Sequence, residues 1–247
     1  MRGNRVAKII DNETIHVFDR SQFDWHIIRN SGQIFRTPPC EITAAADKVV
    51  IKCSDAAYWF NYFDLQTDYN EIKEELAQFA ALRGPIAAGG GIRILRQPFR
   101  EAVIAFIISA NNNIKRFSKT IEQIDFANLE AYTEQDFTKM GCGYRAPYLV
   151  ETIQQLKSIN YAELETLENA ALRKKLMTMP GVGPKVADCI MLFAFHRLNI
   201  APVDVHIRRA IEQLGKEQAY TIMNHRYAGV AQQYLFYFVQ HLKKELK

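Results

Sequence analysis

The sequence lacks any apolar run long enough to cross a membrane, because no stretch approaches the roughly 18 residues that a spanning helix requires. Its first residues, MRGNRVAKIIDNETIHVF, also lack the apolar core and the cleavage site of a secretory signal peptide. These two absences predict a cytoplasmic protein with no membrane partner.

Cysteine is scarce, and its spacing argues against two kinds of metal site. The four cysteines form no C-x-x-C pair: Cys40, Cys53, Cys142 and Cys189. Structural zinc sites and iron–sulfur clusters are typically built from closely spaced cysteines. We therefore expect no cofactor, and widely spaced cysteines suit a reducing, intracellular compartment.

Neither sign of charge dominates the chain. A net charge of +4, with 23% charged and 48% hydrophobic residues among 247, is typical of a soluble globular protein that has one sizeable core or a few small ones. The small basic excess suits a polyanionic partner, but it does not separate a nucleic-acid-binding protein from many metabolic enzymes.

The pattern of apolar residues changes near residue 69. Before it, short segments rich in β-branched residues and separated by turn-forming clusters are predicted to form strands: residues 5–10, 14–18, 33–36 and 48–53. After it, helical periodicity predicts these helices: residues 67–83, 99–110, 113–124, 136–141, 148–158, 169–179, 184–198, 205–215 and 225–244. The fold class is therefore α+β and mostly α. We expect an antiparallel sheet domain over residues 1–68 and a helical domain over residues 69–247, with AAGGGIR at 87–93 as a flexible connector.

A glycine-rich turn joins two of the predicted helices. In PGVGPKVADC (residues 180–189), Gly181 and Gly183 permit positive φ angles and the close approach of a phosphate to the backbone. The N–H groups of the helix that Pro184 opens would hold that phosphate. For an isolated G-V-G, a tight turn that needs glycine for its geometry alone is an equally good interpretation.

Two ionisable residues follow the turn. Lys185 occupies the second position of the helix, where the helix dipole disfavours the ammonium form and so favours a neutral, nucleophilic amine. A solvated surface lysine is the alternative. Asp204 in PVDVH precedes the next predicted helix and can cap it. From the same place its carboxylate can stabilise positive charge on a sugar whose glycosidic bond is breaking.

These segments together resemble the helix-hairpin-helix DNA glycosylases, and among them the 8-oxoguanine DNA glycosylases of the animal and yeast type rather than the iron–sulfur branch. The resemblance rests on segments that follow one another in the family's order: NSGQIFR at 30–36, LRQPFREAVIAFIISANNNIKR at 95–116, GCGYRAPY at 141–148, PGVGPKVADC, PVDVH and AGVAQQYLF at 228–236. It implies a two-lobed helical glycosylase fold with the helix-hairpin-helix at about 168–198. It also implies a monomer that acts on double-stranded DNA containing 8-oxoguanine opposite cytosine.

The resemblance implies a bifunctional glycosylase and β-lyase of base excision repair. Lys185 would attack C1′ of a flipped nucleotide, expel the oxidised base and form a Schiff base that permits β-elimination of the 3′ phosphate. Asp204 would stabilise the oxocarbenium-like transition state. His206, with Arg208 or Arg209, would contact phosphates near that sugar.

The resemblance also assigns residues to the damaged base. Gly32 matches the glycine whose carbonyl accepts the N7 hydrogen that 8-oxoguanine carries and guanine lacks, and guanine would leave that buried acceptor unpaired at a cost of about 1–3 kcal/mol. Gln232 would read the Watson–Crick edge, while Phe236 and Cys189 would sandwich the ring, with Cys189 as a thiolate beside the ammonium of Lys185. Without the resemblance, these residues indicate a hairpin turn, a core aromatic and a buried structural cysteine.

On the opposite strand, Asn111 matches the residue that enters the duplex and Tyr144 the wedge beside it, while Arg116 and Arg145 match the arginines that grip the orphan cytosine. Arg116 argues for cytosine preference, because some bacterial relatives lack an arginine there. Without the resemblance, Asn111 and the two asparagines after it indicate a helix end.

The resemblance further implies that a cation bridging to a DNA phosphate could be held by three carbonyls: those of Met177, Met179 and Val182. Two residues, Pro184 and Val230, depart from the eukaryotic members, and the segment before the last helix is short, which leaves some phosphate contacts unassigned.

Two alternatives remain. An alkylated-purine or mismatched-adenine glycosylase of the same superfamily is opposed by Lys185 and by the missing cluster cysteines, respectively. A non-catalytic helix-hairpin-helix DNA-binding module would have no use for Gly32, Gln232 and Phe236 together.

Overall fold

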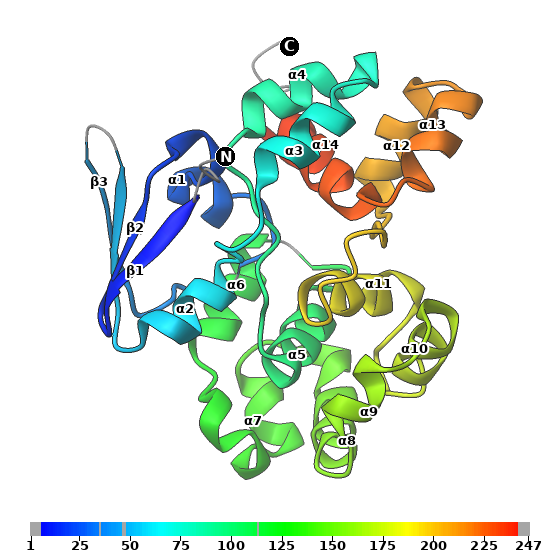
Figure 1. The fold of residues 1–247 in the computed structure, drawn as a ribbon. Coiled ribbons are helices and arrows are strands. Elements are labelled where there is room, and N and C mark those ends of the chain that lie inside the picture. The colour runs from blue at the N-terminus through cyan, green and yellow to red at the C-terminus, as the bar shows by residue number, and fades with distance from the viewer. Residues whose placement is uncertain (1–5, 35, 46–47, 113, 242–247) are drawn as a thin grey trace. The chain divides into compact units, whose positions relative to one another are not determined.

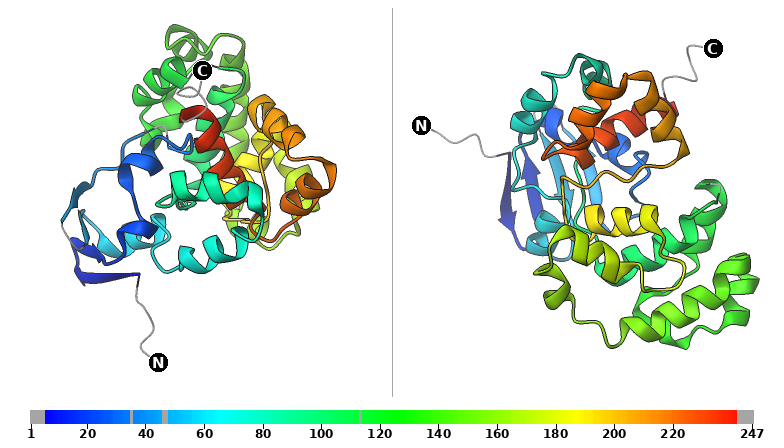
Figure 2. Two further views of the ribbon diagram at one scale, coloured as in Figure 1. Left: turned by 90° about the horizontal axis from the view of Figure 1, so that it is seen from above. Right: turned by 90° about the vertical axis from the view of Figure 1, so that its right-hand side faces the viewer.

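The computed structural model describes residues 6–34, 36–45, 48–112 and 114–241, without the side chains of residues 114, 115, 206 and 213. Contacts divide the chain into two units, one of residues 1–96 and 198–247 and the other of residues 97–197. This division differs from the expected sheet and helical domains, because helix α14 (Ala228–His241) packs along α4 (Ala80–Gly89) in the first unit (Figures 1 and 2). Among the described helices, none has the length and apolar character needed to cross a membrane.

A four-stranded antiparallel sheet lies in the first unit, in the order β1-β2-β4-β3 (Figure 1). Its strands are β1 (Ala7–Asp11), β2 (Thr14–Val17), β3 (Glu41–Ala44) and β4 (Val49–Lys52). In the central pair, Ile15 faces Ile51 and Val17 faces Val49, and all four side chains are buried. Their two-residue period puts one face of the sheet against a core. The predicted strands at 5–10, 14–18 and 48–53 are confirmed within a few residues.

The predicted strand at 33–36 is wrong, because none of its described residues lies in the sheet. The fourth strand is instead β3, whose Ile42 pairs with Ile51. Gln33 is fully buried in a loop, where its side chain bonds to the backbone of residues 93–95. A long-range contact, and not strand pairing, therefore explains why the residue is buried.

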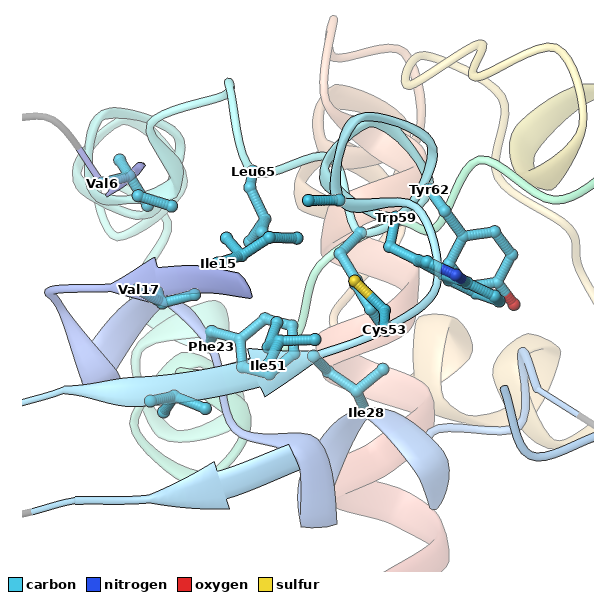
Figure 3. Close-up of a cluster of buried hydrophobic side chains, with 14 of the residues drawn as sticks. Val6, Ile15, Val17, Phe23, Ile28, Ile51, Cys53, Trp59, Tyr62 and Leu65 are labelled. Atoms are coloured by element: carbon cyan, nitrogen blue, oxygen red, sulfur yellow. The ribbon is translucent and has the colours of Figure 1, made fainter. Parts of the chain in front are cut away.

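The core against the sheet is closed by short elements that the periodicity did not indicate: η1 (Arg20–Gln22), α1 (Trp25–Arg29) and α2 (Ala56–Tyr62). Asp55 caps α2 by accepting a hydrogen bond from Tyr58 N at 3.0 Å. The next turn brings Trp59 into the cluster that also holds Phe23 and Ile51 (Figure 3). The large apolar area of such aromatic side chains accounts for much of this core.

The remaining helices of the first unit are α3 (Tyr69–Leu76), α4, α12 (Val205–Gln213), α13 (Lys216–Met223) and α14. The helix predicted at 67–83 is two helices, α3 and α4. The predicted flexible connector at 87–93 is also wrong, because α4 continues to Gly89 and Arg93 is fully buried. A Cβ on Gly91 would lie 2.5 Å from Asp24 N, so this glycine permits close packing of two backbone segments.

The described part of the second unit contains helices and no strand, and it centres on α5 (Phe99–Ser109), which is buried on almost every side. Around it lie α6 (Ile114–Glu122), η2 (Phe126–Ala131), α7 (Glu134–Lys139), η3 (Gly143–Arg145), α8 (Ala146–Leu156), α9 (Tyr161–Glu165), α10 (Asn169–Leu176) and α11 (Pro184–Phe193) (Figure 1). Phe106 of α5 stacks on Phe193 of α11 with ring centres 5.3 Å apart. This packing holds the C-terminal end of α11 against α5, and the predicted nucleophile Lys185 stands near the other end of α11.

Candidate active site

Only one of the two glycines in the turn between α10 and α11 adopts the positive φ angle that glycine permits. Gly181 has φ +78°, and a Cβ there would lie 3.0 Å from Ile107 Cγ2, so both its backbone and its surroundings require glycine. Gly183 has φ −86° and ψ 179°, an extended conformation that any residue adopts. Gly183 therefore does not use the positive φ that glycine permits, because this residue is the N-cap of α11.

Gly183 nevertheless leaves space at the start of α11. A Cβ at this position would meet no atom within 4 Å, and the residue is exposed. Having no side chain, Gly183 cannot cap the first N–H groups of the helix. These groups and the helix dipole form a site suited to a phosphate oxygen.

Lys185 occupies the second position of α11, as the sequence predicted. Its side chain is half-buried, and Nζ lies 6.0 Å from the centre of the Phe106 ring. The amine therefore stands near both an aromatic ring and the positive end of a helix. Cys189 lies one turn further along the same helix and is buried.

An ion pair that the sequence patterns did not indicate joins the two helices of the hairpin. Arg173 of α10 has Nη2 2.5 Å from Oδ1 of Asp188 on α11. Burial raises the pKa of the Asp188 carboxyl, and the guanidinium of Arg173 opposes that shift. Helical spacing does not reveal this ion pair, although Asp188 is a charged residue within a largely apolar helix, which could have drawn attention to it.

A second group of predicted residues meets around the C-terminal end of α5. Asn111 is exposed and has φ +48°. The Arg145 guanidinium donates to the carbonyl of Ala110 through Nε at 3.0 Å and to that of Asn111 through Nη2 at 3.0 Å. Arg145 is itself buried and lies 4.3 Å from the centre of the Tyr144 ring. Its planar fork of donors holds the turn that presents Asn111.

Tyr144 and Arg116 complete this group. The Tyr144 side chain is 60% exposed, which is unusual for a large aromatic residue and leaves its ring accessible to a ligand. Arg116 is exposed on α6 and donates from Nη2 to the carbonyl of Gly141 at 3.1 Å. Gly141 precedes η3, the short helix that carries Tyr144 and Arg145. The structure thus brings together all four residues predicted to face the opposite strand.

In the first unit, Gly32 and Phe236 are in direct contact although they are far apart in the sequence. Gly32 has φ +77°, and a Cβ there would lie 2.6 Å from Cε1 of Phe236. No larger residue fits without displacing the ring. Gln232 lies one turn before Phe236 on α14, where its Oε1 accepts a hydrogen bond from Gln233 Nε2 at 3.0 Å. Three of the four residues predicted to contact the base therefore lie in the first unit: Gly32 in a turn, and Gln232 and Phe236 on α14.

Asp204 is the N-cap of α12, and its Oδ1 accepts a hydrogen bond from Ile207 N at 2.8 Å. The capping role that the sequence suggested is confirmed. This bond fixes the carboxylate, and the other carboxylate oxygen, Oδ2, does not take part in the cap. Arg208 and Arg209 are exposed on the same helix, whereas the His206 side chain lies outside the described part of the chain.

The turn carbonyls proposed to hold a cation include that of Met179, which accepts from Val182 N at 3.1 Å. Met177 at the start of the turn is exposed. Among the residues that the structure describes, no three His, Cys, Asp or Glu side chains are grouped to hold a metal ion.

The candidate residues belong to both units. Lys185, Cys189, the hairpin glycines and the residues around Asn111 lie within residues 97–197, whereas Gly32, Asp204, Gln232 and Phe236 lie in the other unit. The second unit thus supplies a nucleophile with a phosphate site, and the first supplies a glycine carbonyl beside an aromatic ring.

The sequence matches a family model described as the N-terminal domain of 8-oxoguanine DNA glycosylase over residues 10–103. The chain is 36% identical over 152 residues to an N-glycosylase/DNA lyase of Saccharomyces cerevisiae, and 33% identical over 145 residues to the N-glycosylase/DNA lyase OGG1 of Arabidopsis thaliana. These alignments cover 48% and 47% of this chain, but only 40% and 39% of the two relatives.

Solved structures match over nearly the whole chain. An 8-oxoguanine glycosylase/lyase of Clostridium acetobutylicum, in complex with double-stranded DNA containing cytosine opposite 8-oxoguanine, is 30% identical with a TM-score of 0.84. The match covers 94% of this chain and 97% of that one. A 3-methyladenine DNA glycosylase of Archaeoglobus fulgidus has a TM-score of 0.70 at 16% identity, which indicates a similar fold only.

Proposed function

Since this chain belongs to the 8-oxoguanine DNA glycosylase family, we propose that it is a bifunctional DNA glycosylase and β-lyase that removes 8-oxoguanine opposite cytosine from double-stranded DNA. The observation that carries the proposal is Lys185 at the second position of α11, two residues after the open Gly183. A glycosylase that only directs water to the sugar has no need of an amine there.

The first chemical step is an attack on the sugar. The neutral amine of Lys185 attacks C1′ of the flipped nucleotide, and the glycosidic bond breaks with its electron pair leaving on the damaged base. The sugar becomes cationic as this bond breaks. The Asp204 carboxylate, held by the N–H of Ile207, stabilises that charge without having to reorganise.

The second step uses the same amine. The adduct of Lys185 opens to a Schiff base, which makes the C2′ hydrogen acidic, and loss of that proton expels the 3′ phosphate by β-elimination. Hydrolysis of the imine then returns the lysine. The yeast and Arabidopsis relatives are described as N-glycosylase/DNA lyases, which supports both steps here.

Base selection is assigned to the first unit. The Gly32 carbonyl accepts the N7 hydrogen of 8-oxoguanine, while guanine presents a lone pair and leaves the acceptor unpaired at a cost of about 1–3 kcal/mol. Gln232 reads the Watson–Crick edge, and Phe236 stacks on one face of the base. The contact between Gly32 and Phe236 supports this assignment, because it holds the acceptor beside a stacking surface. Cys189 covers the other face of the base. Before the attack its thiolate forms an ion pair with protonated Lys185, and transfer of the proton from the ammonium to the thiolate frees the neutral amine that attacks C1′.

The residues around Asn111 are assigned to the duplex. Asn111 enters the space left by the flipped base, with Tyr144 as a wedge beside it, while Arg116 and Arg145 hold the orphan cytosine.

The DNA backbone is assigned to other residues. Its phosphates are contacted by Gly181, Gly183 and His206, and a cation that bridges to the DNA is held by the carbonyls of Met177, Met179 and Val182. The protein acts as a monomer.

The test is borohydride trapping on duplex DNA with 8-oxoguanine opposite cytosine. We expect a covalent adduct for the wild type and none for Lys185→Gln. The matched control is Lys174→Gln, which changes an exposed lysine of α10 in the same hairpin and should leave trapping intact. Excision of 8-oxoguanine without a trapped adduct would contradict the lyase activity. Binding of the duplex without excision would indicate a non-catalytic DNA-binding module.

A further inference from the structure

Gln33, next to Gly32, is a fully buried polar residue with no role in the proposed chemistry. Its Nε2 donates to the carbonyl of Arg93 at 2.9 Å, and its Oε1 accepts from Leu95 N at 3.0 Å. One side chain thus pairs with both a donor and an acceptor of a backbone segment about sixty positions away. Buried polar side chains that make such complete pairings fix local geometry.

The residue on the other side of Gly32 is held as well. Ser31 is fully buried, and its Oγ donates to the carbonyl of Ile28 at 2.7 Å while accepting from Gln33 Nε2 at 2.8 Å. The glycine with φ +77° therefore lies between two side chains that bond to each other. This arrangement restricts the rotation of the peptide that carries the Gly32 carbonyl.

The backbone that Gln33 binds is itself held by buried hydrogen bonds. The Arg93 side chain is fully buried and donates to the carbonyls of Gln22 at 2.9 Å and Phe63 at 3.1 Å. Its charge is thereby satisfied by carbonyl groups on two other segments of the same unit. The next residue, Ile94, donates its N–H to the Tyr69 hydroxyl at 2.9 Å. Gln33 thus connects the Gly32 loop to a segment that buried hydrogen bonds hold in place.

We propose that Gln33 is a positioning residue, which fixes the direction of the Gly32 carbonyl and so determines how well 8-oxoguanine is distinguished from guanine. The inference rests on the proposed function, in which that carbonyl accepts the N7 hydrogen. The nitrogen of the peptide in question belongs to Gln33, so a change in the position of Gln33 turns the carbonyl. A hydrogen bond weakens steeply with misalignment, whereas stacking on Phe236 tolerates it.

The test is Gln33→Met, which keeps the length of the side chain and removes its donor and acceptors. The matched control is Gln22→Met, because Gln22 is also buried in the same unit and also has two side-chain hydrogen bonds, to Tyr69 N and to Asp19. Single-turnover excision of 8-oxoguanine and of guanine, both opposite cytosine, is measured together with β-elimination at a preformed abasic site, which needs no base reading.

We expect Gln33→Met to lower 8-oxoguanine excision about tenfold or more and to narrow the ratio of 8-oxoguanine to guanine excision. Elimination at the abasic site should fall much less. Gln22→Met should keep the ratio. Ser31→Ala removes only the hydroxyl that Gln33 contacts and is expected to narrow the ratio in the same direction, so it carries the test if Gln33→Met does not fold.

A folded Gln33→Met or Ser31→Ala protein with the wild-type ratio would overturn the inference while leaving the proposed function intact. Equal narrowing in Gln22→Met would also overturn it, since general loosening of the unit would then suffice. A wild type that neither excises 8-oxoguanine nor cleaves the abasic site would refute the proposed function itself, and this inference with it.

Discussion

The contact between Gly32 and Phe236 makes Gly32→Ala the most informative single substitution. The backbone has φ +77° at this position, and a residue with a Cβ in that left-handed conformation costs about 1–2 kcal/mol. The added methyl group would also lie 2.6 Å from Cε1 and 3.2 Å from Cζ of the phenylalanine ring. Overpacking of this kind typically costs about 1–3 kcal/mol. We therefore expect the free energy of unfolding to fall by about 2–5 kcal/mol.

A double-mutant cycle separates these two costs. Leucine in place of Phe236 has no atom at the Cε1 and Cζ positions, so Gly32→Ala in a Phe236→Leu background should lose only the backbone part, about 1–2 kcal/mol. Denaturant unfolding of the four proteins gives the coupling energy. The excision rate of Gly32→Ala should also fall further than its loss of folded protein explains. The added methyl group displaces the Phe236 ring and with it the Gly32 carbonyl that reads the base.

Two results would refute this reasoning. An unfolding free energy within about 0.5 kcal/mol of the wild type would mean that the site accepts a side chain. An equal loss in both backgrounds would mean that the ring does not oppose the methyl group, and that glycine is needed for its backbone conformation alone.

Three further predictions follow from single contacts. Asp204→Asn keeps an acceptor for Ile207 N, so thermal unfolding should show little change while single-turnover excision falls by about 100-fold or more; parallel losses would indicate a purely structural cap. The pKa of Asp188 is raised by burial above 3.8, so the folded state binds the proton more tightly than the unfolded state. Stability should therefore decline as pH rises from about 4 through the raised pKa. Arg173→Gln should steepen that decline, and Asp188→Asn should remove it. The measurement is urea unfolding across pH, and an identical pH dependence in the wild type and both variants would contradict the raised pKa of Asp188. Arg116→Ala should narrow the gap between excision opposite cytosine and opposite adenine, and a gap of wild-type size would remove the argument for opposite-base reading.

Local sequence patterns determined the parts of the fold that local physics controls. Strands β2 and β4 were predictable because they are rich in β-branched residues such as Ile15 and Ile51 and because turn-forming clusters flank them. Helix α5 was predictable from the helical periodicity of residues 99–110. Helix α2 was missed because AAYWFNY has no clear helical stripe, although the cap at Asp55 was a usable signal.

The errors have one common cause, which is contact between distant segments. The described residues of the strand expected at 33–36 lie in a loop, where Gln33 bonds to the backbone near Arg93. The connector expected at 87–93 is instead closely packed, because Gly91 lies against Asp24. Neither partner is visible in a local window. The neighbourhood of Gly32 and Phe236 likewise could not be derived from periodicity, and only resemblance to a family pointed to both residues.

The central claim is that the amine of Lys185 forms the covalent bond to the sugar, and peptide mapping of the borohydride-trapped adduct tests it most directly. Protease digestion followed by mass spectrometry should find the reduced sugar adduct on the peptide that contains Lys185 and on no other. An adduct on a different lysine or on the N-terminal amine would contradict the account.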